Sequence, residues 1–553
     1  MAATIGETVA LIGIAAPASI AARACGSRVA CRSNVLLALR LASGVGARLG
    51  VLAALSLLGH TEAIYAADTD VPAKALAAAK ASPQPAPAVC AGFQDFFFTN
   101  CQLAWYGVRF YGTIDVGYGY QTHGAPFDPN FVTGASYFLQ KMNRTLMWGI
   151  APNGLGQSNV GVQIREPLGP GWSFVAQLEA GFDPYSLRLA NSTASVFANA
   201  GVPVSQQTTN GDASRAGQFY NSVGFLGASS DVFGTLTVFR QNALTTDGVL
   251  AYDPMGGAYA FSPIGFSGTV AGGGDTENSR YSTAVKYRVA VGALRAAALW
   301  QFGGYNLNNG SNGAWGAQIG GDFRLGAGTL SLDAIAGYNK DAVNLTLNGA
   351  ATNTAGQPIG AMLPQTVTAT LSNNSDLMAL AKYAVERLRL YVGYEWMQFA
   401  PPSDPFTAAG TGFTTIVGDF VCVGCGTATG GTNINSTAFS ESAGFRDRVL
   451  QVIWAGARYD ITDTVSVAGA YYHYHQNNFA ASAANLAACN VAATNKSFCA
   501  GAMDAVSGLI DWKFAPKWDT YIGTFYSSFN GGLANGYLAR NNVATTAGIR
   551  FRF

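Results

Sequence analysis

Hydrophobic and polar positions alternate along the last eleven residues of the chain. Phe553, Phe551 and Ile549 fall on one side of an extended segment, whereas Arg552 and Arg550 fall on the other. Because successive residues of a β-strand point to opposite faces, the pattern predicts a strand with one apolar and one cationic face. Such a strand suits a wall between water and an apolar phase, although an edge strand of a soluble domain would alternate in the same way.

The same alternation recurs upstream in segments of about ten residues, joined in turn by tight turns and long polar loops. We place about sixteen such strands, an even number that is typical of a transmembrane antiparallel β-barrel. They cover or centre on residues 110–120, 159–165, 172–179, 219–227, 234–240, 280–288, Leu299, Ile319, Ala334, Leu380, Val392, Ala455, Ala470, Leu509, Gly523 and the final strand. A soluble β-helix or propeller is the alternative, but no repeat of fixed length is present.

The alternation also divides the side chains between the inside and the outside of such a barrel. By parity, Arg165, Lys382 and Arg389 are expected to face inward. Tyr111 and Tyr391 are the inward aromatic residues that we identify, and they form no continuous aromatic track.

Parity also predicts which way two side chains on neighbouring strands should face. Within residues 280–288, Tyr281 should face away from the side that carries Lys286. Arg240 shares the parity of Val238 and should face outward. Since an unpaired arginine in lipid is costly, we expect Arg240 to lie at a contact between subunits.

The composition supports a barrel over a helical membrane protein. Charged residues make up 11% of the 553 residues, against about 25% in ordinary soluble domains. Glycine (67), phenylalanine (32) and tyrosine (24) are abundant. Beyond the N-terminal region, no run reaches the roughly 20 apolar residues that a membrane helix needs. The net charge of +1 argues against a nucleic-acid partner.

The N-terminal region has the pattern of an export signal. Two arginines, Arg40 and Arg48, precede an apolar run that is followed by small residues. We therefore expect a cleaved leader over residues 1–67. Residues 68–104 are expected to form a periplasmic linker, and residues 105–553 the barrel.

Six of the eight cysteines lie beyond the expected leader, in three local pairs. An even number of exported cysteines predicts disulfides. The pairs are Cys90 with Cys101, Cys422 with Cys425, and Cys489 with Cys499. The second pair also has the spacing of half a zinc site, but no second cysteine pair lies nearby, so we expect no metal.

Four stretches of the chain together resemble Gram-negative general diffusion porins. They are residues 110–115, 158–179, 233–288 and 547–553, and the resemblance covers nearly all of residues 105–553. The aromatic end of the chain, Phe553 with Phe551 and Ile549, also resembles the assembly signal of outer-membrane barrels. The segment from Cys90 to Cys101, with its three consecutive phenylalanines, is not part of the common porin pattern.

The resemblance implies a sixteen-stranded barrel, usually a homotrimer, whose third long loop folds into the lumen. That loop would be residues 241–279, with Asp253-Pro-Met-Gly-Gly257 near its tip. The residues implied at the pore constriction are Asp247, Asp253, Asp275, Glu277, Arg280, Arg165, Lys382 and Arg389. Three positions of the porins' basic ladder hold Thr113, Asn159 and Tyr220, so no strong ion preference follows.

By resemblance, the chain is expected to be an outer-membrane channel for passive diffusion of small hydrophilic solutes and ions. The implied partners are a homotrimer, outer-membrane lipid, lipopolysaccharide and the barrel-assembly machinery, with no cofactor and no catalytic residue. A channel selective for sugars or organic acids is the alternative. An enzyme would need a nucleophile beside His123, His473 or His475, and none is evident. A loop-based adhesin or phage receptor would be a secondary role.

Overall fold

The computed structural model describes the barrel wall, the segment before it and part of the loops. The described residues are 89–123, 146–187, 189, 219–264, 280–304, 311–343, 351–353, 358–360, 366–368, 371–400, 403, 406–407, 421–423, 447–478, 500–531 and 539–553. The expected leader and the sites Asp275, Glu277, Cys425, Cys489 and Cys499 lie outside them.

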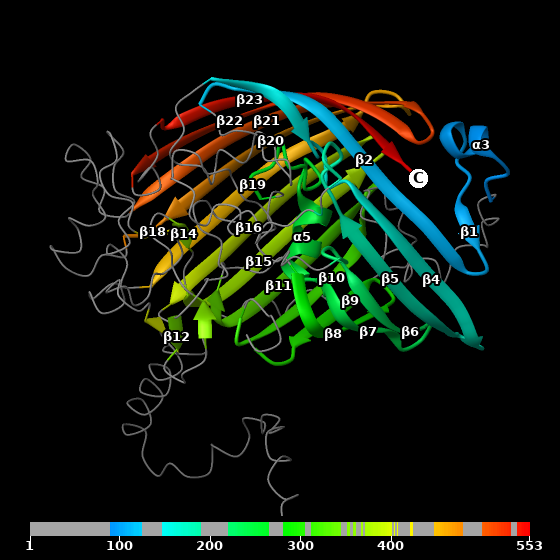
Figure 1. Ribbon diagram of the computed structural model, residues 1–553, viewed down its shortest axis with the longest axis horizontal. Coiled ribbons are helices and arrows are strands. Elements are labelled where there is room, and N and C mark those ends of the chain that lie inside the picture. Colours follow the sequence, from blue (N-terminus) through cyan, green and yellow to red (C-terminus); the bar gives the residue numbers. More distant parts are fainter. Residues whose placement is uncertain are drawn as a thin grey trace, which may run out of the picture. The chain divides into compact units, whose positions relative to one another are not determined.

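The wall is a closed antiparallel barrel of 16 strands. Its strands are β2 (Val108–Gln121), β4 (Asn159–Gly169), β5 (Trp172–Gly181), β6 (Gly224–Ser230), β7 (Gly234–Asn242), β8 (Arg280–Val291), β9 (Leu294–Gln301), β10 (Gly313–Leu325), β11 (Gly328–Val343), β15 (Leu371–Val385), β16 (Leu388–Ala400), β19 (Arg448–Asp460), β20 (Val465–Gln476), β21 (Gly501–Ala515), β22 (Trp518–Gly531) and β23 (Asn541–Arg552). The last strand pairs with β2 along the register Ile114↔Phe551 and Gly117↔Gly548, which closes the barrel (Figure 1). Every one of the strands predicted from alternation is present.

One wall position is shared by two strands. The first half of β2 pairs with β4, and its second half pairs with β3 (Met147–Pro152). Between them, residues 153–158 leave the wall. Asp115 holds this excursion, because its buried carboxylate accepts bonds from Leu155 N (2.7 Å) and Tyr521 OH (2.5 Å).

The two faces of the wall differ as the alternation predicted. Outward residues such as Val392 and Ile522 are 54% and 51% exposed. Arg550 and Arg552 point to the other face, where both bond to Asp519 (3.1 and 2.8 Å). Among the described residues, no helix is long and apolar enough to cross a membrane.

One irregularity in the β7–β8 ladder shifts the alternation on both strands, and parity misplaced a residue on each. On β8, Thr283 has φ 52°, and Tyr281 before it is buried, donating to Asn339 Oδ1 (2.8 Å) on the inner side. On β7, the shift follows Phe239, where φ is 83°. Arg240 after it is only 8% exposed and donates to Asn221 O (3.2 Å) within its own chain. The expectation of an outward Arg240 at a subunit contact was therefore wrong, because a bulge changes the face to which the next residue points.

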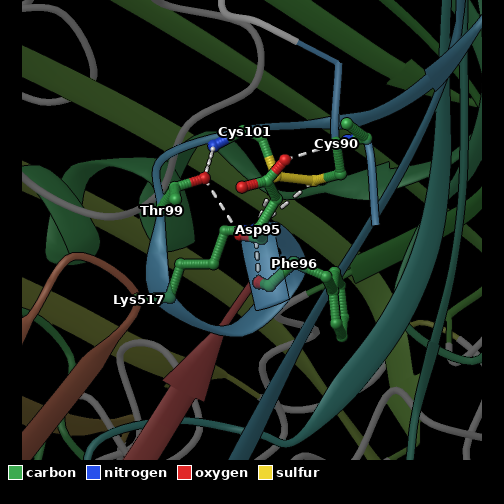
Figure 2. The surroundings of a disulfide bond; sticks show 7 residues. Cys90, Asp95, Phe96, Thr99, Cys101 and Lys517 are labelled. Carbon is green, nitrogen blue, oxygen red and sulfur yellow. Dashed lines mark hydrogen bonds between the residues drawn. A yellow bond between two sulfur atoms is a disulfide. The ribbon is translucent and has the colours of Figure 1, made fainter. Parts of the chain in front are cut away.

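Residues 89–106, called here the N-terminal lobe, precede the barrel. The lobe contains the disulfide Cys90–Cys101, helix α3 (Phe93–Phe98) and strand β1 (Leu103–Trp105). The predicted Cys90–Cys101 pair is thus confirmed. Thr99 links the loop to the helix, since its hydroxyl donates to Asp95 O (2.9 Å) and accepts from Cys101 N (3.2 Å) (Figure 2).

The lobe adds a strand beside the start of β2. The pairing of the last strand with β2 includes Gly112, which is bonded in both directions to Phe553. Before Gly112, β1 pairs with β2, with Leu103 opposite Phe110 and Trp105 opposite Val108. The first residues of β2 therefore have a neighbouring strand on both sides. Their backbone N–H and C=O groups need such hydrogen-bond partners.

The remaining elements are small. Helix α5 (Leu244–Tyr252) follows β7. A short sheet joins β12 (Ala351–Asn353), β13 (Pro358–Gly360) and β17 (Phe406–Thr407), and β14 (Thr366–Thr368) pairs with β18 (Val421–Val423). β18 contains Cys422.

Candidate functional site

Residues 243–264, called here the inner segment, pack on the inward face of the wall. Helix α5 opens the segment and contacts β9, β10, β11, β15 and β16. Gly248 faces this wall so closely that an added Cβ would lie 2.6 Å from Ile335 Cδ1 and 3.0 Å from Leu380 Cδ1. The absence of a side chain at Gly248 therefore allows the helix to lie flat against the wall.

Polar contacts fix the C-terminal end of α5. The Tyr252 hydroxyl donates to Asp333 Oδ2 (2.6 Å), and Trp454 Nε1 donates to the Tyr252 carbonyl (3.0 Å). Arg295 donates both to Tyr252 OH (2.8 Å) and to Asp333. The Lys382 ammonium lies 5.3 Å from the centre of the Tyr252 ring and 3.4 Å from the Ala251 carbonyl oxygen. The helix is thus held at one end by four strands.

Asp253 builds the turn that follows the helix. Its carboxylate accepts from Met255 N (3.2 Å), Gly257 N (2.8 Å) and Tyr472 OH (2.6 Å). Gly256 and Gly257 have φ values of 66° and 73°, which glycine adopts without strain. Burial raises the pKa of Asp253, although these donors oppose the rise. At 2% exposure, Asp253 supports the turn from within.

The end of the inner segment reaches the far side of the barrel. Ala260 N donates to the Gly154 carbonyl (2.9 Å) in the excursion between β3 and β4. Phe261 is fully buried against Tyr521, with ring centroids 6.1 Å apart, and its carbonyl accepts from the Ser507 hydroxyl. From β7 to this excursion, the segment follows the inner wall past most of the strands.

Asp247 is the acidic residue of the inner segment that reaches solvent, with 21% of its side chain exposed. Lys286 Nζ lies 3.0 Å from its carboxylate, and Arg288 also pairs with it. Burial alone would raise the pKa of Asp247, but the charges of Lys286 and Arg288 hold it below its ordinary value. The site is therefore one anion shared by two cations.

Ion pairs continue along the inward face of the wall. Each joins an arginine to an aspartate on the same or a nearby strand, and most of these side chains are partly exposed. The pairs are Arg295 with Asp322 (2.8 Å) and Asp333 (2.7 Å), Arg389 with Asp460 (2.7 Å), Arg458 with Asp511 (3.3 Å), and Arg550 and Arg552 with Asp519. Positive and negative charge is thus interspersed along this wall.

The wall strands β2, β4 and β5 carry a different set of inward groups. Tyr111 donates to Glu179 Oε2 (2.9 Å) and accepts from Gln177 Nε2 (2.5 Å). Glu179 also accepts from the Ser222 hydroxyl. Arg165, near the turn between β4 and β5, is exposed.

The structure brings together only part of the predicted constriction set. Asp247 and Asp253 lie in the inner segment, and Lys382 contacts its Tyr252. Arg389 pairs with Asp460 near a tight turn, and Arg165 lies apart. Arg280 begins β8, beyond the bulge. The role of these residues at a constriction stays a prediction.

Sequence reasoning missed two cationic residues and one anchoring aromatic pair. Lys286 and Arg288 alternate on β8, so their inward parity was visible, but only the bulged structure shows that they meet Asp247. Tyr252 and Trp454 are 202 residues apart, and no local pattern links them.

The inward aromatic residues are more numerous than the two expected. Tyr391 and Tyr111 do face inward, and Trp454, Tyr472 and Tyr474 join them on adjacent strands. All three are fully buried. They therefore form packing around the inner segment.

The two strand histidines face outward. His473 Nδ1 lies 2.8 Å from Asp504, which also accepts from Tyr471 OH (2.6 Å). Within the described part of the chain, no group of three or more histidine, cysteine or acidic residues is arranged to hold a metal ion.

A model of the Gram-negative porin family matches residues 75–503 of the chain. The chain belongs to the Gram-negative porin family. This porin is therefore an outer-membrane channel through which small hydrophilic solutes and ions diffuse passively. The search of curated proteins gives no match.

Solved structures with a similar barrel are distant in sequence. The anion-selective porin from Comamonas acidovorans is 14% identical, with 81% of this chain and 99% of that chain covered and a TM-score of 0.47. OmpT of Vibrio cholerae is 13% identical (82% and 99% covered, TM-score 0.45). OmpF of Salmonella typhi, in complex with daunomycin, is 12% identical (81% and 97% covered, TM-score 0.43).

Proposed function

We propose that the aperture of this porin lies between the inner segment and the wall formed by β2, β4 and β5. The observation that carries this proposal is the path of the inner segment, which is bonded to the wall from β8 to β21 and at Gly154 and packs on Tyr521 of β22. The polar groups of Tyr111, Gln177 and Glu179 then face the segment across the remaining lumen. Asp275 and Glu277, which the resemblance also implies at the constriction, lie outside the described residues.

We further propose that the channel has only a weak ion preference. Every arginine in the ion pairs along the wall has a carboxylate within 3.3 Å. A close pair of opposite charges gives a field that falls off much faster than that of a single charge, and salt screens the remainder within about 8 Å at physiological ionic strength. Small polar solutes of either sign would therefore pass.

A homotrimer is the assembly we propose, with β2 and β3 at the contact between subunits. Tyr118, Trp148 and Ile150 form an outward patch there and are 55%, 61% and 54% exposed. Large clustered rings of this kind are favoured at the centres of protein interfaces. The loop over residues 187–217, which the resemblance implies as a latch onto a neighbouring subunit, lies largely outside the described residues.

Single-channel recording in a planar bilayer tests these proposals together. We expect ohmic openings in groups of three and a small reversal potential in a salt gradient. A large reversal potential, or block by one solute at low concentration, would favour the substrate-selective channel. Single openings from a correctly folded protein would contradict the trimer.

A further inference from the structure

The N-terminal lobe lies on the outer face of the barrel. Phe97 stacks on Phe551 (ring centroids 5.2 Å apart), and Phe96 meets Phe553 edge-on (5.2 Å). Phe551 has the parity of Ile549, which is exposed on the outward face. Trp518 completes the contact, since its Nε1 donates to the Phe97 carbonyl (3.0 Å). The lobe thus covers the outward side of the barrel's last strand.

A cation and the disulfide hold the lobe in this position. Lys517, in the tight turn between β21 and β22, donates to the Phe96 carbonyl (2.8 Å), and its ammonium lies 4.9 Å from the centre of the Phe96 ring (Figure 2). A helix as short as the six residues of α3 is not stable by itself. The Cys90–Cys101 bond closes the chain around it and so fixes which rings face the barrel.

Aromatic contacts continue from the lobe onto the neighbouring outer surface. Rings follow one another from Trp512 to Phe514 (5.7 Å), to Trp518 (6.4 Å), to Phe97 (6.3 Å) and to Phe98 (6.4 Å). Trp512 and Phe514 lie on the outward face of β21 and are 50% and 44% exposed. The ring series therefore joins the lobe to the surface that an outer-membrane barrel presents to lipid.

The far side of the lobe is apolar and exposed. Phe93 and Phe98 are 80% and 65% exposed, and Trp105 at the end of β1 and Tyr106 in the turn after it are 69% and 83% exposed. All four lie at the end of the barrel that carries the tight turns, which is the periplasmic end in such barrels. Aromatic side chains concentrate at this level, where the head groups of a bilayer meet its acyl chains.

We propose that the N-terminal lobe is a membrane anchor that inserts its exposed rings, led by Phe93 and Phe98, into the interface of the inner phospholipid leaflet. Lipid fits better than a second copy of the chain, because the ring series leads to β21. The lobe pairs only with the first residues of β2, whereas the patch on β2 and β3 lies along the second half of β2. The anchor extends the aromatic girdle of the barrel beyond its wall, and it acts separately from the passage of solutes.

Photo-cross-linking tests this proposal. The folded, oxidised porin carries p-benzoylphenylalanine in place of Phe93 or Phe98 and is reconstituted into vesicles of phosphatidylethanolamine and phosphatidylglycerol. Ile510, half exposed on the outward face of β21, is the positive control site. Asp463, whose side chain is 90% exposed in another tight turn, is the negative one.

We expect phospholipid adducts, detected by mass, at positions 93 and 98 at a yield similar to that at 510 and about tenfold above that at 463. Cross-links to another copy of the chain would overturn the proposal in favour of a subunit contact. Adducts at 510 without adducts at 93 and 98 would also overturn it, since the lobe would then face water. Unchanged channel conductance in each variant shows that the barrel has folded.

Discussion

Two short helices pack on opposite faces of the same wall, and the means by which they are held differ. Helix α5 is held inside by hydrogen bonds and charges, with Tyr252, Asp333 and Trp454 at its C-terminal end. Helix α3 is held outside by stacked rings, one lysine and a disulfide. The inward face offers polar partners as well as apolar ones such as Ile335 and Leu380, whereas the outward face offers mainly apolar side chains.

The two helices should therefore differ in their sensitivity to substitution. The inner segment depends on individual polar groups that cannot be removed without leaving a buried partner unsatisfied. The N-terminal lobe depends on the contact area of its rings and on its disulfide. A small change in ring size should therefore weaken its contact with the barrel only slightly. Four variants test this difference, from the largest expected effect to the smallest.

Replacing the turn-building carboxylate should have the largest effect. Asp253→Ala leaves Tyr472 OH and two backbone N–H groups of the turn without their acceptor, at a cost of about 3 kcal/mol. We expect the inner segment to leave the wall, so that single-channel conductance rises and becomes noisy. Asp463→Ala, at an exposed turn, should change neither quantity. An unaltered conductance in Asp253→Ala would show that the turn does not hold the segment.

Removing the disulfide should loosen the lobe and leave the barrel intact. Cys90→Ser with Cys101→Ser releases a constraint between residues 11 positions apart, which in the chain-entropy account is worth about 2 to 3 kcal/mol. We expect faster protease cleavage between residues 90 and 101, measured on the folded protein, with unchanged conductance. Cleavage at the wild-type rate would mean that the ring contacts alone hold the lobe.

Neutralising Asp247 should alter ion preference more than stability. Asp247→Asn leaves Lys286 and Arg288 without their anion, so we expect a shift in reversal potential toward anions of about twofold in permeability ratio. Asp463→Asn is the matched control, because it removes the same charge at an exposed turn. A shift of equal size in the control would assign the effect to net charge.

The pH dependence of the Asp247 contact follows from its lowered pKa. A carboxylate whose pKa is lower in the folded protein stabilises the fold above its unfolded pKa of about 3.9, and that stability is lost as the pH falls through the lower folded value. Asp247 should therefore stay ionised from neutral pH down to about pH 4, and the difference in reversal potential between the wild type and Asp247→Asn should be constant over that range. Loss of this difference between about pH 7 and pH 5 would contradict the assignment.

Replacing one aromatic ring of the lobe by a leucine side chain should have the smallest effect. Phe97→Leu removes the stacking on Phe551 and Trp518 but keeps much of the apolar area, at a cost of about 1 kcal/mol. We expect the protease susceptibility of the lobe to rise less than in the disulfide variant. Phe98→Leu, at an exposed position, should leave it unchanged.

The wall was largely predictable from sequence, because alternation over a whole strand is a strong local signal. The bulges at Phe239 and Thr283 were not, since a single inserted residue leaves no composition signal and yet reverses the facing of the residues after it. Strand β3 was missed because it shares one wall position with β4.

The site was predictable only in part. The resemblance implied a turn at residues 253–257, but only tertiary contacts show the Asp253 carboxylate buried beneath it. The docking of the lobe joins Phe97 to Trp518, 421 residues away, and Lys517 to Phe96 over the same separation. Pairings of that range are set by the closure of the barrel and leave no trace in a local pattern.

Solute uptake by liposomes tests the central claim, an aqueous channel narrowed by the inner segment. With wild-type protein, we expect swelling in small neutral sugars at a rate that falls steeply with solute size, and swelling in larger sugars when Asp253→Ala frees the segment. A correctly folded wild-type barrel that swells liposomes no faster than lipid alone would contradict the account.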